Sequence, residues 1–166
     1  MKRIVLGFIA VLLVSIGVAA CNQNDIAALV TTLGNASASI ATLEGNTALA
    51  AKLQTDTAAA SSAALNWKKG SAGTEVVEAL NLVEADLNLI PGTSQYAPLV
   101  DLAIGTVESI IELVQPGAAS ITPANPRVGV THRVYLANPP KSAAQFRTAW
   151  NSVKAQHPEL ANAPAL

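Results

Sequence analysis

The sequence predicts an all-α protein, a bundle of four or five helices with an extended, proline-rich segment before the last helix. Apolar residues recur at alternating spacings of three and four in several separate stretches, and this is the period of one helix face. Aromatic residues make up only 4% of the chain, which favours close helix packing. Cys21 is the only cysteine among the 166 residues, so burial of apolar side chains, rather than an internal disulfide, must stabilise the fold.

The first predicted helix covers residues 24–46. Asn24 or Asp25 is expected to cap its start, and Gly45 with Asn46 is expected to end or bend it. Its apolar positions follow a 3-4-3-4-3 spacing and are Ile26, Leu29, Leu33, Ala36, Ile40 and Leu43.

A second helix, or a bent continuation of the first, is expected to run to about Trp67. Its middle, residues 55–64, is a tract of alanine, serine and threonine, and small residues of this kind let helices approach closely. Gly34 lies in the first helix, where glycine costs about 1 kcal/mol relative to alanine, so we expect a packing contact there. Residues 68–73, KKGSAG, form a turn rich in helix breakers.

Residues 74–92 form the third predicted helix. Gly73 or Thr74 is expected at its N-cap, and Pro91 with Gly92 is expected to stop it. Its apolar side chains follow a 4-3-4-3 spacing and are Val76, Leu80, Val83, Leu87 and Ile90.

The fourth predicted helix, residues 97–117, is apolar on almost every side. Pro98 suits its first turn. A helix of this kind is expected at the centre of a bundle. Its polar residues form one narrow stripe of Asp101, Gly105, Glu108 and Glu112.

Residues 118–166 differ in character from the predicted bundle of residues 21–117. Residues 118–141 are rich in proline, and only 127–136 have the β-branched and aromatic content of a short strand or hairpin. We expect this stretch to wrap the bundle in an extended conformation.

The last predicted helix spans residues 142–160 and packs on the bundle. Ser142 and Gln145 have capping-box spacing at its start, and Pro158 is expected to end it by His157. The tail at 161–166, ANAPAL, is expected to fray. The apolar face of this helix comprises Phe146, Trp150 and Val153.

The first 20 residues have the features of a signal peptide that is removed on export. Lys2 and Arg3 supply the positive start, residues 4–18 are apolar, and small residues precede Cys21. The apolar run lies at the lower limit for crossing a bilayer, and no cluster of basic residues follows it, so a retained membrane span is the weaker interpretation.

The residues Val18-Ala19-Ala20-Cys21 resemble the lipobox of bacterial lipoproteins. This resemblance implies that Cys21 becomes the first residue of the mature chain, carries diacylglycerol on its sulfur and anchors the protein to a membrane. Acyl chains contribute about 0.8 kcal/mol per buried methylene, so two or three chains hold a protein durably. Asn22 after the cysteine favours the outer over the inner membrane in a Gram-negative envelope. Ordinary secretion, with Cys21 as a free thiol, is the alternative.

The charge of the mature chain argues against nucleic-acid binding. Without Lys2 and Arg3, eight basic residues face eleven acidic ones, which is not a basic footprint. Acidic residues concentrate in 75–112 and basic residues in 127–154. The simplest interpretation is that the basic part folds back on the acidic helices, and the alternative is a basic face toward anionic lipid or a wall polymer.

Motifs that carry chemistry are scarce. His132 and His157 lie far apart without metal-ligand spacing, so we predict no metal and no cofactor. Glutamates 75, 78 and 84 are expected on the solvent-facing side of their helix, and the chain has no nucleophile elbow or phosphate loop. Five aromatic residues are interpreted as core anchors, with a cleft for sugar or peptide as the alternative: Trp67, Tyr96, Tyr135, Phe146 and Trp150.

The best candidate for a partner surface is the C-terminal unit, because aromatic and basic residues are enriched at interfaces. Its members are His132, Arg133, Tyr135, Lys141, Arg147 and Trp150.

These observations predict a non-enzymatic lipoprotein of the bacterial envelope that acts as a structural or protein-interaction module with an unknown protein partner. The alternative is a carrier or sensor that holds a small apolar ligand around residues 99–114. A cell-wall enzyme would need carboxylates or histidines that converge in a cleft. A phage-encoded lysis or surface-exclusion lipoprotein fits the same sequence.

Overall fold

Five α-helices make up the regular structure of the chain in the computed structural model, which describes residues 22–69, 71–117 and 138–166. A short 3-10 helix, η1 (Pro158–Leu160), follows the last one, and these ranges contain no strand. The predicted all-α class is therefore confirmed, whereas residues 1–20 and the predicted strand at 127–136 lie outside the described residues. The helices are α2 (Gln23–Leu43), α3 (Thr47–Asn66), α4 (Thr74–Leu87), α5 (Ala97–Val114) and α6 (Ala143–Gln156).

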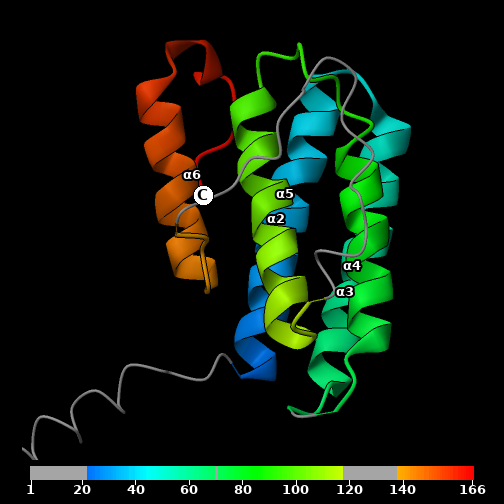
Figure 1. Ribbon diagram of the computed structural model, residues 1–166. Coiled ribbons are helices and arrows are strands. Elements are labelled where there is room, and N and C mark those ends of the chain that lie inside the picture. Colours follow the sequence, from blue (N-terminus) through cyan, green and yellow to red (C-terminus); the bar gives the residue numbers. More distant parts are fainter. Residues whose placement is uncertain (1–21, 70, 118–137) are drawn as a thin grey trace, which may run out of the picture.

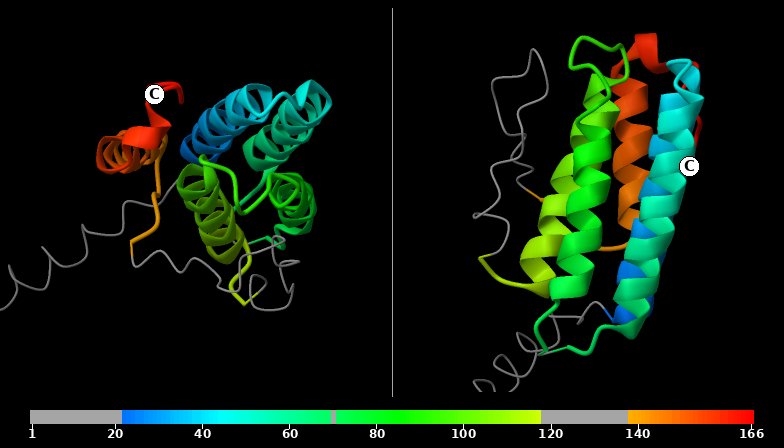
Figure 2. Two further views of the ribbon diagram at one scale, coloured as in Figure 1. Left: turned by 90° about the horizontal axis from the view of Figure 1, so that it is seen from above. Right: turned by 90° about the vertical axis from the view of Figure 1, so that its right-hand side faces the viewer.

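The first four helices run alternately up and down and form a four-helix bundle, with α6 beside it (Figure 1). Helix α3 packs against α2 and α4, and α5 packs against α4 and α2. Seen from above, α6 lies outside the four helices and next to α2 and α5 (Figure 2). The expectation of a central helix at 97–117 therefore holds for α5, but α2 shares that position because it also packs against three helices.

The N-cap of helix α2 lies two residues before Asn24, the earlier of the two residues expected there. Asn22 is its N-cap: the Asn22 side chain accepts the Asp25 N–H at 2.9 Å, and the Asp25 carboxylate accepts the Asn22 N–H at 3.3 Å. Asp25 is thus the second partner of a capping box, rather than the cap itself. The helix ends at Leu43 with Glu44 as its C-cap, and Gly45, with φ at +77°, turns the chain away just beyond it, as expected. Asn46 bonds back to the Ala41 carbonyl and caps α3 through the Leu49 N–H.

The contact expected at Gly34 exists. A Cβ on residue 34 would lie 2.1 Å from Cγ2 of Thr57 on α3, so only glycine allows the two helices to come this close. The Ser61 hydroxyl of α3 donates to the Ala27 carbonyl of α2 at 3.2 Å, which requires the same close approach. Alanines are buried on both helices, among them Ala36 and Ala41 on α2 and Ala60 and Ala64 on α3, in agreement with the predicted role of the small residues.

Helix α4 ends at Leu87, before the residues expected to stop it. The proline ring at 91 would clash with the Leu87 carbonyl if the helix continued. That carbonyl instead accepts the Ile90 N–H at 3.1 Å in a tighter turn. Helix α5 has Pro98 in its first turn, as predicted. Ser94 in the loop between the two helices donates to the Glu44 carboxylate at 2.6 Å, which ties this loop to the α2–α3 turn.

Helix α6 follows the prediction at both ends, but the tail does not. Ser142 caps the start by accepting the Gln145 N–H, although the Gln145 side chain accepts the Lys141 N–H and does not complete the capping box. The helix ends at Gln156, before His157 and Pro158. The expectation that residues 161–166 fray is wrong. Asn151 binds both backbone groups of Leu166, at 2.9 and 3.3 Å, and holds the tail against the helix.

The core joins all five helices. Trp67, Tyr96, Phe146 and Trp150 are buried, so the interpretation of these aromatics as core anchors is confirmed, whereas Tyr135 lies outside the described residues. Among the described helices, α2 has the length and composition of a membrane-crossing helix, and 61% of its apolar window is buried inside the bundle. That burial is what a core helix of a bundle would show.

Candidate functional site

The residues predicted to form a partner surface are not brought together in the part of the chain that the structure describes. His132, Arg133 and Tyr135 lie outside it, as does Cys21. Lys141 and Arg147 are exposed at the start of α6. Trp150 is fully buried, and its indole N–H donates to the Pro164 carbonyl at 2.8 Å. Trp150 therefore offers no surface to a partner.

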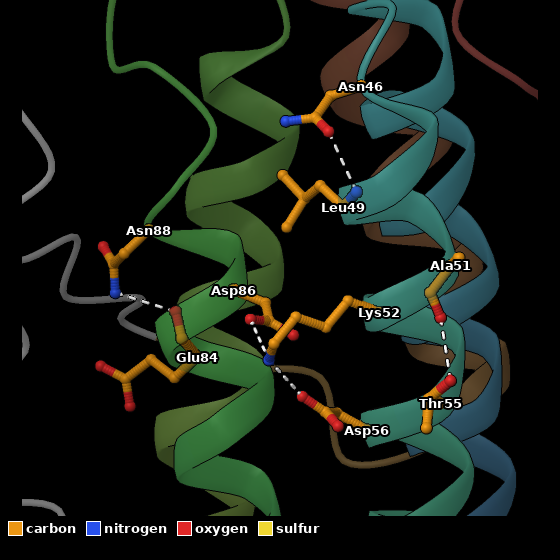
Figure 3. A network of polar contacts seen from close by, with 9 residues as sticks. All are labelled: Asn46, Leu49, Ala51, Lys52, Thr55, Asp56, Glu84, Asp86 and Asn88. Atoms are coloured by element: carbon orange, nitrogen blue, oxygen red, sulfur yellow. Dashed lines mark hydrogen bonds and ion pairs between the residues drawn. The ribbon is translucent and has the colours of Figure 1, made fainter.

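Figure 3 shows the polar cluster that links α3 to α4. The Lys52 ammonium lies 2.7 Å from the Asp56 carboxylate on its own helix and 2.6 Å from the Asp86 carboxylate on α4. The Asp86 side chain is only 3% exposed, and its second oxygen has no hydrogen-bond partner. The lysine therefore bridges a partly exposed and a buried carboxylate.

The three groups shift one another's pKa in different directions. Burial raises the pKa of Asp86, and the Lys52 ammonium only partly offsets this. The hydrogen bond from Lys52 lowers the pKa of Asp56. The hydrogen bonds to Asp56 and then Asp86 raise the pKa of Lys52, so the ammonium stays protonated and does not act as a base. The cluster is suited to holding two helices together rather than to proton transfer.

The sequence shows only half of this cluster. Lys52 and Asp56 have the i, i+4 spacing of a helical ion pair, but nothing local marks Asp86 as their partner. Glu84 on the same helix was expected on the solvent side and is buried instead, whereas Glu75 and Glu78 are exposed as predicted. The reason is that α4 packs against both α3 and α5, so its buried arc is wider than its apolar spacing suggests.

A pocket of about 390 Å³ lies at the connection between α3 and α4. The Trp67 indole N–H donates to the Ser71 carbonyl at 3.4 Å across this connection. The Ser71 hydroxyl itself donates to the Lys68 carbonyl at 2.6 Å. Most of the lining side chains are exposed, and none belongs to α5 or to the Lys52 cluster.

His157 is the histidine that the structure describes. Its Nδ1 atom lies 2.7 Å from the Glu159 carboxylate, and both side chains are partly exposed. A backbone hydrogen bond and this contact with His157 lower the pKa of Glu159. In the described ranges no group of three or more histidine, cysteine, aspartate or glutamate residues could hold a metal ion.

The end of the bundle that carries Asn22 is the feature most closely connected with the predicted lipid anchor. We call it the Asn22 end, and it comprises residues 22–27, 61–69, 71–77 and 111–117. Ser61 joins α3 to the first turn of α2 through the Ala27 carbonyl. Gly73, at the start of α4, packs so closely on Val114 of α5 that a Cβ would lie 1.9 Å from its Cγ1 atom. The ends of four helices therefore meet beside the residue that follows Cys21.

The comparisons with protein-family models, curated proteins and solved structures find no match for the chain.

Proposed function

We propose that the protein is a lipoprotein of the bacterial envelope, anchored through Cys21, that acts as a structural or protein-interaction module rather than as an enzyme. The observation that carries the proposal is the continuity between the lipobox-like residues 18–21 and the fold. Asn22, the next residue, is already the N-cap of α2. Cleavage before Cys21 would leave intact every helix that the structure describes.

The contacts of the bundle support a rigid module. Lys52 bridges α3 and α4, Ser94 ties two connections at the opposite end, and Asn151 holds the C-terminal tail. Each of these polar groups is used to join parts of the fold. A helical body fixed in this way suits a protein whose role depends on its shape and surface at the membrane.

Fractionation of cells tests the proposal. The chain is expressed in a Gram-negative bacterium with a labelled fatty acid, beside Cys21→Ala and the double variant Cys21→Ala/Leu43→Cys. The original chain is expected in the membrane fraction with label attached. Both variants are expected outside that fraction and without label, because one has no cysteine and the other has its thiol at position 43, where no lipobox precedes it. All three are expected to show the same helical circular dichroism. An unlabelled, water-soluble original chain would contradict the proposal.

A further inference from the structure

We infer that the Asn22 end of the bundle rests on the bilayer surface, so that the four helices stand upright on the membrane. This inference rests on the lipid anchor proposed above. The partner that it names for this end of the protein is a lipid surface.

The first argument is the absence of a linker between the anchor and the fold. Consecutive Cα atoms are about 3.8 Å apart, so an acylated Cys21 would lie within one residue of the first turn of α2. Asn22 is held there by two hydrogen bonds with Asp25, at 2.9 and 3.3 Å. A tether this short keeps the Asn22 end at a high effective concentration next to the headgroups.

The second argument is the apolar surface at this end. Leu65, in the last turn of α3, is 49% exposed, and Leu113, in the last turn of α5, is 47% exposed. Leu65 lies one turn beyond Ser61, which contacts α2, and Leu113 precedes Val114, which packs against Gly73. In a protein free in solution these large apolar side chains would face water. On a membrane-anchored protein they can contact the interface of the bilayer instead.

The charges of the Asn22 end are mixed. Lys68 and Lys69 are exposed in the connection after α3. In an upright bundle this connection faces the membrane, where both ammonium groups can contact lipid phosphates. The acids at this end are Asp25, Glu75 and Glu112, of which Asp25 and Glu112 accept backbone N–H groups. Because the charge is nearly balanced, the orientation depends on the position of the anchor and on the leucines more than on attraction to anionic lipid.

The opposite end supplies a matched control. Leu43, at the end of α2, is 46% exposed, which is nearly the same exposed fraction as that of Leu65. Because α2 rises about 1.5 Å per residue, Leu43 lies roughly 30 Å from the start of that helix. An upright bundle therefore places Leu65 at the lipid surface and Leu43 in water.

The experiment uses the full chain, lipidated in cells and reconstituted in vesicles of equal parts phosphatidylcholine and phosphatidylglycerol. Leu65→Cys or Leu43→Cys is labelled with a polarity-sensitive fluorophore, which does not react with a thioether at Cys21. A quencher attached to the lipid headgroups is expected to quench the label at 65 several-fold more than the label at 43. If either variant fails to fold, the comparison is repeated with Leu113→Cys at the Asn22 end and with Leu89→Cys at the opposite end, where Leu89 is 64% exposed just beyond the end of α4.

Each other outcome overturns the inference in a recognisable way. Equal quenching at the two positions would mean that the bundle lies on its side. The protein could also float with the vesicles without quenching at either position. Another surface, such as a second copy of the chain, would then cover the Asn22 end, while the lipid anchor would still hold. Protein that does not float with the vesicles would refute the proposed function together with the inference.

Discussion

Thr57 of α3 lies directly against Gly34 of α2. A Cβ at position 34 would be 2.1 Å from Cγ2 and 2.5 Å from Cβ of Thr57. This contact sets the separation of the two helices that form the first hairpin of the bundle. It also explains why a glycine is found in the middle of an otherwise regular apolar helix face.

Gly34→Ala is expected to destabilise the fold in spite of the better helix propensity of alanine. The gain from propensity is about 1 kcal/mol, whereas overpacking of a tight interface costs about 1–3 kcal/mol. Because a Cβ at 2.1 Å from Thr57 places Gly34→Ala in the upper part of that range, at about 2–3 kcal/mol, we expect a net loss of roughly 1–2 kcal/mol in the free energy of unfolding, measured by urea denaturation. Moving the glycine across the interface, in Gly34→Ala/Thr57→Gly, should recover part of the loss. If Gly34→Ala were as stable as the original chain, this result would contradict the close contact.

Lys52→Met is expected to destabilise the fold more than Asp56→Asn does. The methionine leaves the buried Asp86 carboxylate without its cation, whereas Asp56→Asn removes only the partly exposed i, i+4 pair and leaves Lys52 on Asp86. Because the Lys52 side chain is half exposed and solvent screens its charge, we expect a loss of about 1–2 kcal/mol for Lys52→Met and less than about 1 kcal/mol for Asp56→Asn. Urea denaturation of both variants checks the order, and the reverse order would rule out the bridging role of Lys52.

The two aspartates are expected to have opposite effects on the pH dependence of stability. The pKa of Asp86 is raised, so its contribution is present below the unfolded value of 3.8 and is lost as pH rises through the folded pKa. The pKa of Asp56 is lowered, so its contribution is present above 3.8 and is lost as pH falls through the folded pKa. The loss of stability caused by Asp86→Asn, measured against the original chain, should therefore be larger in acid than at neutral pH. The loss caused by Asp56→Asn should be larger at neutral pH than in acid. Parallel pH curves for the two variants would refute this assignment.

Asn151→Ala is expected to release the C-terminal tail without unfolding the bundle. The variant loses both hydrogen bonds to Leu166, which contribute about 1 kcal/mol each. Hydrogen exchange should show faster exchange at the Leu166 N–H, while the amides of α2 and α5 stay protected. Asn162→Ala, at an exposed position of the tail, is the control and should leave exchange unchanged. Equal protection of Leu166 in both variants would show that Asn151 does not hold the tail.

The helices could be predicted from the sequence because their signals are local. The 3-4 spacing identifies the apolar faces of α2, α4 and α6, Pro158 marks the end of α6, and Gly34 marks a close contact. The position of the C-terminal tail over Trp150 could not be predicted, because Pro164 reaches the Trp150 indole and Leu166 reaches Asn151 only after the chain turns back on α6. The partner of Lys52 was missed for the same reason, since Asp86 comes from another helix and has no local signal.

Mass spectrometry of the mature N-terminus tests the central claim of a lipid-anchored bundle most directly. The account predicts a chain that begins at Cys21 and carries the added mass of diacylglycerol on its sulfur. A mature chain with an unmodified thiol, or one that still contains residues 1–20, would contradict it.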